Sequence, residues 1–365
     1  MPTRSDTYEQ RVTAVRQKLA AWDVEGVLIA SPANRRWLSG FTGSAGQLLI
    51  TADTALLATD FRYWEQAVAQ APTFTLFKHN RTPENGRAFF VEAGASTIAI
   101  EADHTTLSNA KQIRKAGEGI TFKPIKSAIE PLRAIKTADE IETIRAAAAI
   151  TDEVMAQFPD IARPGITEKE AAWELEKRMR ELGADGMAFE VIVAAGENAA
   201  LPHHRPTDRE LRMGDPIIVD MGAMLNGYHS DMTRTFFLGE PDEQFWAVYN
   251  LVLAAQTAVL DNLKPGLNGK EADALARDVI AAAGHGDHFG HGLGHGVGLE
   301  IHETPFLSVR SEKTTLAAGM TATIEPGVYL PGWGGVRIED LVYLTENGIA
   351  FLSHCPKTPV ISITH

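Results

Sequence analysis

The chain has 365 residues, which is enough for two domains rather than one ordinary core. Hydrophobic residues make up 44% and charged residues 22%, as in soluble globular proteins. The net charge of -13 excludes recognition of nucleic acid through a basic surface. No apolar stretch could span a bilayer or serve as a secretory signal, so we expect no membrane partner. The single cysteine, Cys355, cannot form an internal disulfide, and we expect a cytoplasmic protein.

The N-terminal third alternates helix-like and strand-like patterns. Tyr8, Val12, Val15, Leu19 and Trp22 recur at helical spacing and predict one amphipathic helix. Glycines and prolines separate five short apolar runs, which predict strands in a small α/β domain. These runs are Val27–Ala30, Gln47–Ile50, Ala55–Ala58, Phe74–Phe77 and Thr97–Ile100. The pairs Lys123-Pro124 and Glu130-Pro131 interrupt regular structure near residue 130. We therefore place the domains at 1–130 and 131–365.

The second domain contains a short internal repeat. Thr137 with Glu140, and Thr167 with a glutamate three residues later, have the spacing of helix capping boxes. The segments 163–171 and 264–272 both contain Pro-Gly followed by Lys-Glu-Ala, and each lies between long helical patterns. Two helix-Pro-Gly-helix units suggest a duplicated half-domain with approximate two-fold symmetry. A site between such halves would take ligands from both.

Acidic residues lie in or beside apolar, strand-like runs in this domain. Asp220, Glu325 and Glu339 all do so, although a buried carboxylate without a counter-charge is costly. A metal ion supplies that charge. Together with Asp231 and His295 they form an oxygen-rich set, which suits manganese best and also cobalt, iron or zinc. Bridging carboxylates let five side chains hold two ions about 3.5–4 Å apart, which polarise a carbonyl and convert a shared water into hydroxide.

Other catalytic templates do not fit the sequence. The segment His302-Glu-Thr-Pro-Phe306 begins like a zinc-protease motif, but Phe306 stands where the second histidine is required. The glycines around His291 and His295 match neither the dinucleotide-binding fingerprint nor a phosphate-binding loop. Near Ser44, the glycine spacing differs from that of a serine nucleophile elbow.

With these residues assembled, nearly the whole chain resembles the creatinase/aminopeptidase P/prolidase group of pita-bread metallopeptidases. The segment Asn34–Phe41 resembles the creatinase-type N-terminal domain. The resemblance implies an α/β creatinase-like domain followed by an α+β pita-bread catalytic domain with pseudo-two-fold symmetry. It also implies two divalent metal ions, and it assigns their ligands as Asp220, Asp231, His295, Glu325 and Glu339.

The resemblance implies roles for the remaining motif residues as well. Asp231 and Glu339 would bridge the two ions, and Glu325 would act as the proton shuttle. His291 and His302 would orient the substrate and stabilise the tetrahedral oxyanion. Thr233 would support Asp231 from behind. The residues expected around the substrate are His203, His291, His302, Phe306 and Arg337, the last also supporting the ligand Glu339.

The implied activity is removal of the N-terminal residue from small peptides, with Xaa-Pro aminopeptidase as the leading hypothesis. Many prolidases resembling this chain carry an arginine immediately after the Glu-x-Pro that follows the distal histidine. Here Phe306 takes that place, which favours longer peptides, although Arg205 or Arg310 could substitute for the arginine. The resemblance also implies a homodimer, because members of this family commonly complete the mouth of the active site with the N-terminal domain of a neighbouring subunit. The Asn34–Phe41 segment, which nothing in the catalytic half explains, motivates this expectation here.

Four alternatives to the leading hypothesis remain. They are an Xaa-Pro dipeptidase (prolidase), an aminopeptidase with another preference such as Met-Xaa, a metal-free creatinase-type hydrolase, and a non-catalytic binding module on the same fold.

Overall fold

The computed structural model describes residues 4–80 and 82–362. Contacts divide the chain into two units, 1–133 and 134–365, and each unit has its own core. Among the helices of the described ranges, none combines the length and apolar character needed to span a membrane.

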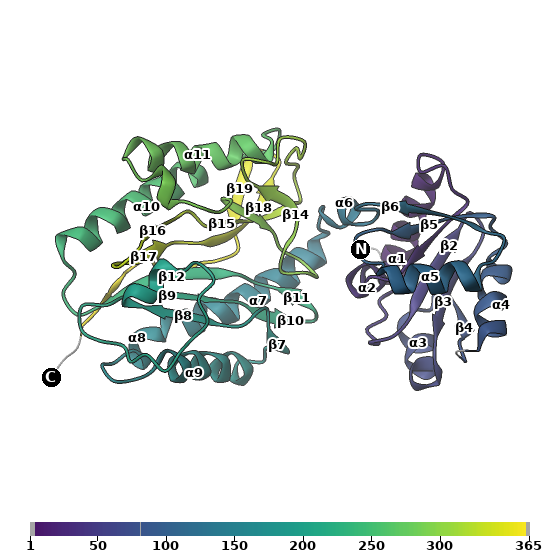
Figure 1. Cartoon of the computed structure of the whole chain (residues 1–365), viewed down its shortest axis with the longest axis horizontal. Coiled ribbons are helices and arrows are strands. Elements are labelled where there is room, and N and C mark those ends of the chain that lie inside the picture. The colour runs from purple at the N-terminus through teal and green to yellow at the C-terminus, as the bar shows by residue number, and fades with distance from the viewer. Residues whose placement is uncertain (1–3, 81, 363–365) are drawn as a thin grey trace. The chain divides into compact units, whose positions relative to one another are not determined.

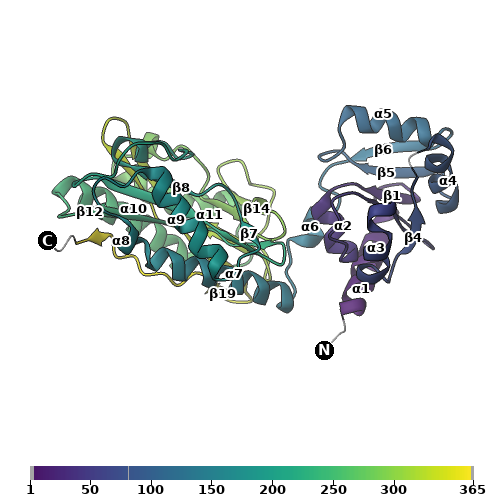
Figure 2. The same cartoon turned by 90° about the horizontal axis from the view of Figure 1, so that it is seen from below.

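The first unit is built on one six-stranded sheet with the strand order β4-β3-β2-β1-β5-β6 (Figures 1 and 2). Strand β1 pairs antiparallel with β2 and parallel with β5. Phe89, Phe90 and Ile113 from two helices pack on this sheet and form the core. The elements are α1 (Arg4–Leu19), β1 (Gly26–Ile29), α2 (Pro32–Ser39), β2 (Gln47–Thr51), β3 (Ala55–Thr59), α3 (Trp64–Gln70), β4 (Thr75–Lys78), α4 (Pro83–Ala93), β5 (Thr97–Glu101), α5 (Leu107–Ala116), β6 (Thr121–Ile125) and α6 (Glu130–Arg133).

The predicted elements of this unit occur with two differences. Each of the five apolar runs forms a strand, but the first helix ends at Leu19, so Trp22 lies in the turn after it. A sixth strand, β6, was not predicted because it contains Pro124. That residue pairs with Ile100 in an edge strand, where a missing backbone N–H removes no ladder bond from the sheet interior.

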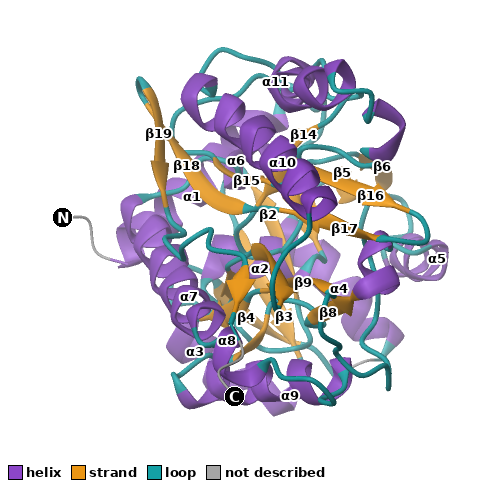
Figure 3. Cartoon of the chain, turned by 90° about the vertical axis from the view of Figure 1, so that its left-hand side faces the viewer, coloured by secondary structure: helices purple, strands orange, loops and turns teal. Residues whose placement is uncertain are grey.

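The second unit places strands between two groups of helices. Figure 1 shows α10 and α11 along one side of the strands and α8 and α9 along the other, and Figure 3 shows strands β8, β9, β16 and β17 between α9 and α10. The helices are α7 (Ala138–Ala156), α8 (Phe158–Ile161), α9 (Glu168–Glu181), α10 (Glu243–Asn262) and α11 (Gly269–Ala282). The strands are β7 (Gly186–Met187), β8 (Ile192–Ala195), β9 (Pro216–Met221), β10 (Ala223–Leu225), β11 (Tyr228–His229), β12 (Met232–Leu238), β13 (Gly294–Gly296), β14 (Glu303–Leu307), β15 (Thr321–Ile324), β16 (Gly327–Leu330), β17 (Gly334–Arg337), β18 (Asp340–Thr345), β19 (Gly348–Phe351) and β20 (Val360–Ile361).

The internal repeat of the sequence is also a repeat of structure. The Pro-Gly turns before α9 and α11 place Gly165 and Gly266 at φ +89° and +97°, a region that favours glycine. The amide of Gly165 donates to the carbonyl of Leu211, and the amide of Gly266 donates to the carbonyl of Leu316. Both following helices begin with a complete capping box. The two halves therefore repeat the same local fold, as the pseudo-two-fold prediction requires.

This repeat carries the acidic residues into equivalent positions. Asp220 follows Leu211 by the same number of residues as Glu325 follows Leu316, and each lies at the end of a strand leaving the repeated turn. Strand β9 pairs antiparallel with β12, and β15 pairs antiparallel with β18. Each half thus contributes a strand pair whose ends carry carboxylates.

Candidate active site

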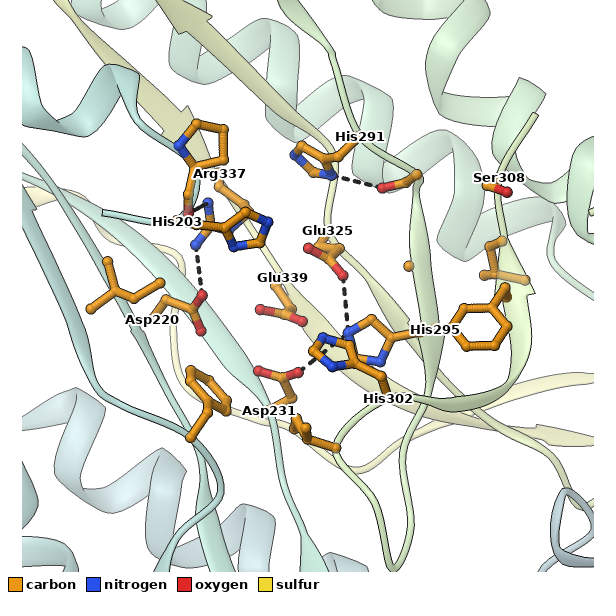
Figure 4. Close-up of a pocket in the computed structure, with 18 of the residues that line it drawn as sticks. His203, Asp220, Asp231, His291, His295, His302, Ser308, Glu325, Arg337 and Glu339 are labelled. Carbon is orange, nitrogen blue, oxygen red and sulfur yellow. Dashed lines mark hydrogen bonds and ion pairs between the residues drawn. The ribbon is translucent and has the colours of Figure 1, made fainter. Parts of the chain in front are cut away.

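One cavity of about 630 Å³ in the second unit collects the predicted site residues (Figure 4). Its lining includes every one of them, namely His203, Asp220, Asp231, His291, His295, His302, Phe306, Glu325, Arg337 and Glu339. The first and last of these residues, His203 and Glu339, are more than 130 positions apart in the sequence. The strand pairs β9/β12 and β15/β18 bring the carboxylates together.

The four carboxylates lie at strand ends. Asp220 lies within β9, and Asp231 comes immediately before β12. Glu325 comes immediately after β15, and Glu339 immediately before β18. At a strand end a side chain can point into a cavity while the strand itself stays packed in the core, and Ile218 and Ile324 are both buried. The carboxylates therefore lie on rigid elements.

In Figure 4, His295 lies to the right of the carboxylates, beside Glu325 and Asp231 and across the cavity from Asp220. Its Nδ1 lies 3.1 Å from the carbonyl oxygen of Gly296, which directs Nε2 toward the acidic residues. Nε2 lies 3.6 Å from Oδ2 of Asp231 and 3.4 Å from Oε1 of Glu325. The hydroxyl of Thr323 accepts the backbone N–H of His295 and donates to Glu325, so one side chain holds both residues in place. Metal-binding histidines are typically held in this way, with the second ring nitrogen bonded to a backbone carbonyl.

The carboxylates of this cluster lie close enough together to share a cation. One oxygen from each of Asp220, Asp231 and Glu339 lies within 4.8 Å of the others. Burial and the neighbouring carboxylates raise the pKa of Asp231 and of Glu339 well above their usual values, and burial raises the pKa of Glu325 to about 8. Oδ1 of Asp220 is buried and accepts no hydrogen bond from the described residues. Oxygen-rich donors with an unsatisfied buried acceptor fit divalent metal ions.

Arg337 supports the ligands from behind the cavity. Its NH2 group donates to Oδ2 of Asp220 at 2.6 Å, and its Nε donates to the hydroxyl of Thr233. That hydroxyl in turn donates to Oε2 of Glu339 at 2.7 Å. The third nitrogen donates to the hydroxyl of Tyr329 and to the carbonyl of Pro202. All three nitrogens of Arg337 are therefore engaged within the protein, which gives this residue a supporting role; the substrate contact also expected for it stays a prediction.

The histidines of the cavity differ in their freedom to bind a peptide. In His291, Nδ1 lies 2.7 Å from the carbonyl of Gly292 and Nε2 lies 2.9 Å from the hydroxyl of Tyr329, so both nitrogens are engaged. Burial, followed by the charge of Arg337, lowers the pKa of His291 to about 4, which keeps this imidazole neutral. His203 and His302 are exposed in the cavity, and neither ring is hydrogen-bonded to any described residue. These two imidazoles are the ones available to a substrate.

Two supporting residues were missed in the sequence. Tyr329, which links His291 to Arg337, resembles an ordinary core residue of a strand. Glu168 resembles an exposed residue in the first turn of a helix, yet it is fully buried and bonds Nε2 of His204 at 2.8 Å. His204 is consequently buried, and its bond to Glu168 fixes the loop that carries His203. The sequence signal for Glu168 is the second histidine of the segment Leu201-Pro-His-His204, which requires a buried partner.

Comparison with known proteins agrees with this geometry. Residues 142–346 match the model of metallopeptidase family M24, and residues 11–135 match that of the creatinase/prolidase N-terminal domain. The chain is 39% identical to an Xaa-Pro dipeptidase of Pyrococcus furiosus, over 89% of this chain and 92% of the other.

Two solved structures extend the likeness. An Xaa-Pro dipeptidase from Bacillus anthracis is 39% identical with a TM-score of 0.94, and covers 97% of this chain and 99% of its own. An X-Pro aminopeptidase from Thermotoga maritima is 36% identical with a TM-score of 0.86, and the match covers 93% and 98% of the two chains. On these matches and the carboxylate–histidine cluster, the chain belongs to metallopeptidase family M24 and carries a creatinase-type N-terminal domain.

Proposed function

We propose that this metallopeptidase removes the N-terminal residue from peptides whose second residue is proline. The observation that carries the proposal is the cavity in which four carboxylates and His295 converge beside two exposed imidazoles. The proline preference rests on relatives that are Xaa-Pro dipeptidases and an X-Pro aminopeptidase.

The five residues that would hold two divalent ions are Asp220, Asp231, His295, Glu325 and Glu339. Bound there, the ions supply Lewis-acid polarisation of the scissile carbonyl and a lowered pKa for an attacking water. The oxygen-rich set favours manganese, with cobalt, zinc and iron as alternatives. We propose a cytoplasmic location and a homodimeric state; sedimentation at micromolar concentration that detects only monomer would contradict the latter.

The residues of the chain then have separate tasks during hydrolysis. Glu325, held by Thr323, takes the proton of the attacking water and passes it to the leaving nitrogen of proline. His302, exposed in the cavity, donates a hydrogen bond to the carbonyl oxygen as negative charge develops on it. His203 contacts the peptide backbone. His291 acts through Tyr329 by keeping Arg337, and through it Asp220, in position.

The length of the preferred peptide distinguishes the two candidate activities, Xaa-Pro aminopeptidase and Xaa-Pro dipeptidase (prolidase). Phe306 lines the cavity and is 46% exposed, so the position of the prolidase arginine is apolar here, which favours an aminopeptidase that accepts longer peptides. The Xaa-Pro dipeptidases among the relatives favour the second candidate, a prolidase.

A small peptide panel tests the proposal. The manganese-loaded protein is incubated with Ala-Pro, Met-Pro, Arg-Pro-Pro, Ala-Pro-Ala-Ala, Met-Ala and Met-Ala-Ser, and product masses are measured. Release of the first residue from the tri- and tetrapeptides with proline in second place supports the aminopeptidase, and cleavage of Xaa-Pro dipeptides alone supports the prolidase. Cleavage of the Met-Ala peptides alone would overturn the proline preference. A Glu325→Ala variant as active as the wild type would overturn the catalytic assignment.

A further inference from the structure

A dipeptide substrate brings a carboxylate close to the scissile bond, and the cavity lining is rich in negative charge. Its carboxylates are those of Asp220, Asp231, Glu325 and Glu339, together with Glu190. The first four are the proposed metal ligands and would be paired with the ions, whereas Glu190 is not. Recognition of a free C-terminus, which a longer peptide does not place here, therefore requires a cationic side chain elsewhere in the lining. This inference rests on the proposed Xaa-Pro exopeptidase function and asks which residue recognises the free C-terminus.

Two arginines line the cavity, and one of them is already engaged. Arg337 is buried, and its three nitrogens donate to Asp220, Thr233, Tyr329 and a backbone carbonyl (Figure 4). Moving this guanidinium toward a substrate would leave the Asp220 carboxylate without its partner. Arg205 is the other arginine of the lining.

Arg205 is available to a ligand. Its side chain is 84% exposed, and its ion-pair partner is Glu190, whose side chain is 64% exposed. The Nε of Arg205 lies 3.3 Å from Oε2 of Glu190. An ion pair that is this exposed to water contributes little to stability, because solvent screens both charges. A substrate carboxylate can therefore replace Glu190 at small cost.

The backbone on both sides of Arg205 is nevertheless fixed. His204, the preceding residue, is bound to the buried Glu168 through Nε2. Thr207 donates to the same carboxylate oxygen from both its backbone N–H and its hydroxyl, at 3.0 and 2.7 Å. Pro206 restricts the chain between the two anchors. The long arginine side chain thus starts from a defined point beside His203, which itself lines the cavity.

We propose that Arg205 is a specificity-determining residue that binds the C-terminal carboxylate of dipeptide substrates, with displacement of Glu190. The planar guanidinium can form two parallel hydrogen bonds to a carboxylate, which a peptide amide at the same place cannot accept. Arg205 thereby replaces the arginine whose usual place is taken by Phe306, and it gives dipeptides an advantage without closing the cavity to longer peptides.

The test compares Ala-Pro with its C-terminal amide, Ala-Pro-NH2, in the manganese-loaded wild type and variants; Glu190→Gln is tested alongside the first four proteins. These four are the wild type, Arg205→Met, Arg212→Met as a matched control at an exposed arginine outside the lining, and Arg310→Met as the competing candidate. We expect the wild type and both other variants to prefer the acid by about tenfold in kcat/KM, mainly through KM. Arg205→Met should abolish this preference and leave cleavage of the amide unchanged. Glu190→Gln should lower KM for the acid alone, because it frees Arg205.

The outcomes separate this inference from the proposed function. If Arg205→Met retains the preference, or if Arg310→Met removes it, the assignment of Arg205 is overturned while cleavage of the amide keeps the proposed function intact. Equal losses on acid and amide in Arg205→Met would indicate a structural effect and would also overturn it. If no protein in the set cleaves either compound, the proposed function itself fails.

Discussion

Substitution of Glu168 tests how the loop that carries His203 is held beside the cavity. The carboxylate is fully buried, and its Oε1 accepts the backbone N–H of Ala195 and the amide of Asn198, both at 2.9 Å. Its Oε2 accepts Nε2 of His204 at 2.8 Å and both donors of Thr207. Five donors on one carboxylate form the connection between helix α9 and the loop that carries His203.

The substitution Glu168→Gln keeps the shape of the side chain and replaces one of its oxygens with an NH2 group. That group cannot accept, so at least two donors lose their acceptor, whichever way the amide is oriented. A hydrogen bond to a charged group contributes about 1.5–3 kcal/mol, so the free energy of unfolding should fall by about 3–6 kcal/mol. The loosened loop should also raise KM for Ala-Pro more than it lowers kcat.

Urea unfolding followed by tryptophan fluorescence measures this loss. The control is Glu170→Gln on the same helix, because Glu170 is exposed and accepts only within its own capping box. We expect the control to unfold close to the wild type. A loss below 1 kcal/mol in Glu168→Gln, or equal losses in the two variants, would refute the assignment.

The pH dependence of the difference in the free energy of unfolding between wild type and Glu168→Gln gives a second check. Burial opposes ionisation of Glu168, but the hydrogen bonds from Asn198 and its neighbours hold its pKa below the usual 4.5. A carboxyl with a depressed pKa in the folded state contributes stability above the pKa of the unfolded state, and this contribution is lost as pH falls through the folded pKa. The gap between wild type and Glu168→Gln should therefore be complete at pH 7 and narrow below pH 4.

Three further predictions concern the cavity. Tyr329→Phe removes the hydroxyl between His291 and Arg337, and it should lower the free energy of unfolding by about 1–3 kcal/mol and kcat by at least tenfold, measured by urea unfolding and by Ala-Pro turnover. Phe306→Arg should lower KM for Ala-Pro but not for Ala-Pro-Ala-Ala; equal changes on both peptides would argue against a carboxylate contact at this position. After the metal is removed by chelation, the free energy of unfolding should fall as the pH rises from 5 to 8. The reason is that the pKa of Glu325, about 8 in the folded protein, lies above its value in the unfolded chain, so the stabilisation of the protonated carboxyl is lost as pH rises. The slope is about 1.4 kcal/mol per pH unit for one carboxyl, and added manganese should abolish this pH dependence in thermal unfolding.

Much of the fold and most of the candidate site follow from local sequence patterns. The apolar runs that become β1 to β5, the capping boxes of α7 and α9 and the Pro-Gly repeat all depend on residues a few positions apart. The carboxylates Asp220 and Glu325 could be singled out because each interrupts an apolar strand, where burying a charge is costly. The family resemblance then grouped them with His295.

The supporting residues depend on distant partners and leave no local pattern. Tyr329 bonds His291 across 38 positions, and Glu168 bonds His204 across 36. A tyrosine in a strand and a glutamate in the first turn of a helix are both favoured by local structure alone, so nothing in either sequence context indicates a second role. The engagement of both nitrogens of His291 likewise depends on Tyr329, which is why His291 and His302 looked equivalent before the fold was known.

We propose that four carboxylates and His295 hold two divalent ions on which peptide cleavage depends. The most direct measurement is titration of the chelated, metal-free protein with Mn²⁺, in which bound metal per chain and Ala-Pro cleavage are followed in the same samples. We expect that two ions bind per chain, that activity appears with them, and that Glu339→Gln loses both metal binding and activity. Full cleavage by the metal-free protein, or two ions bound undiminished by Glu339→Gln, would contradict this proposal.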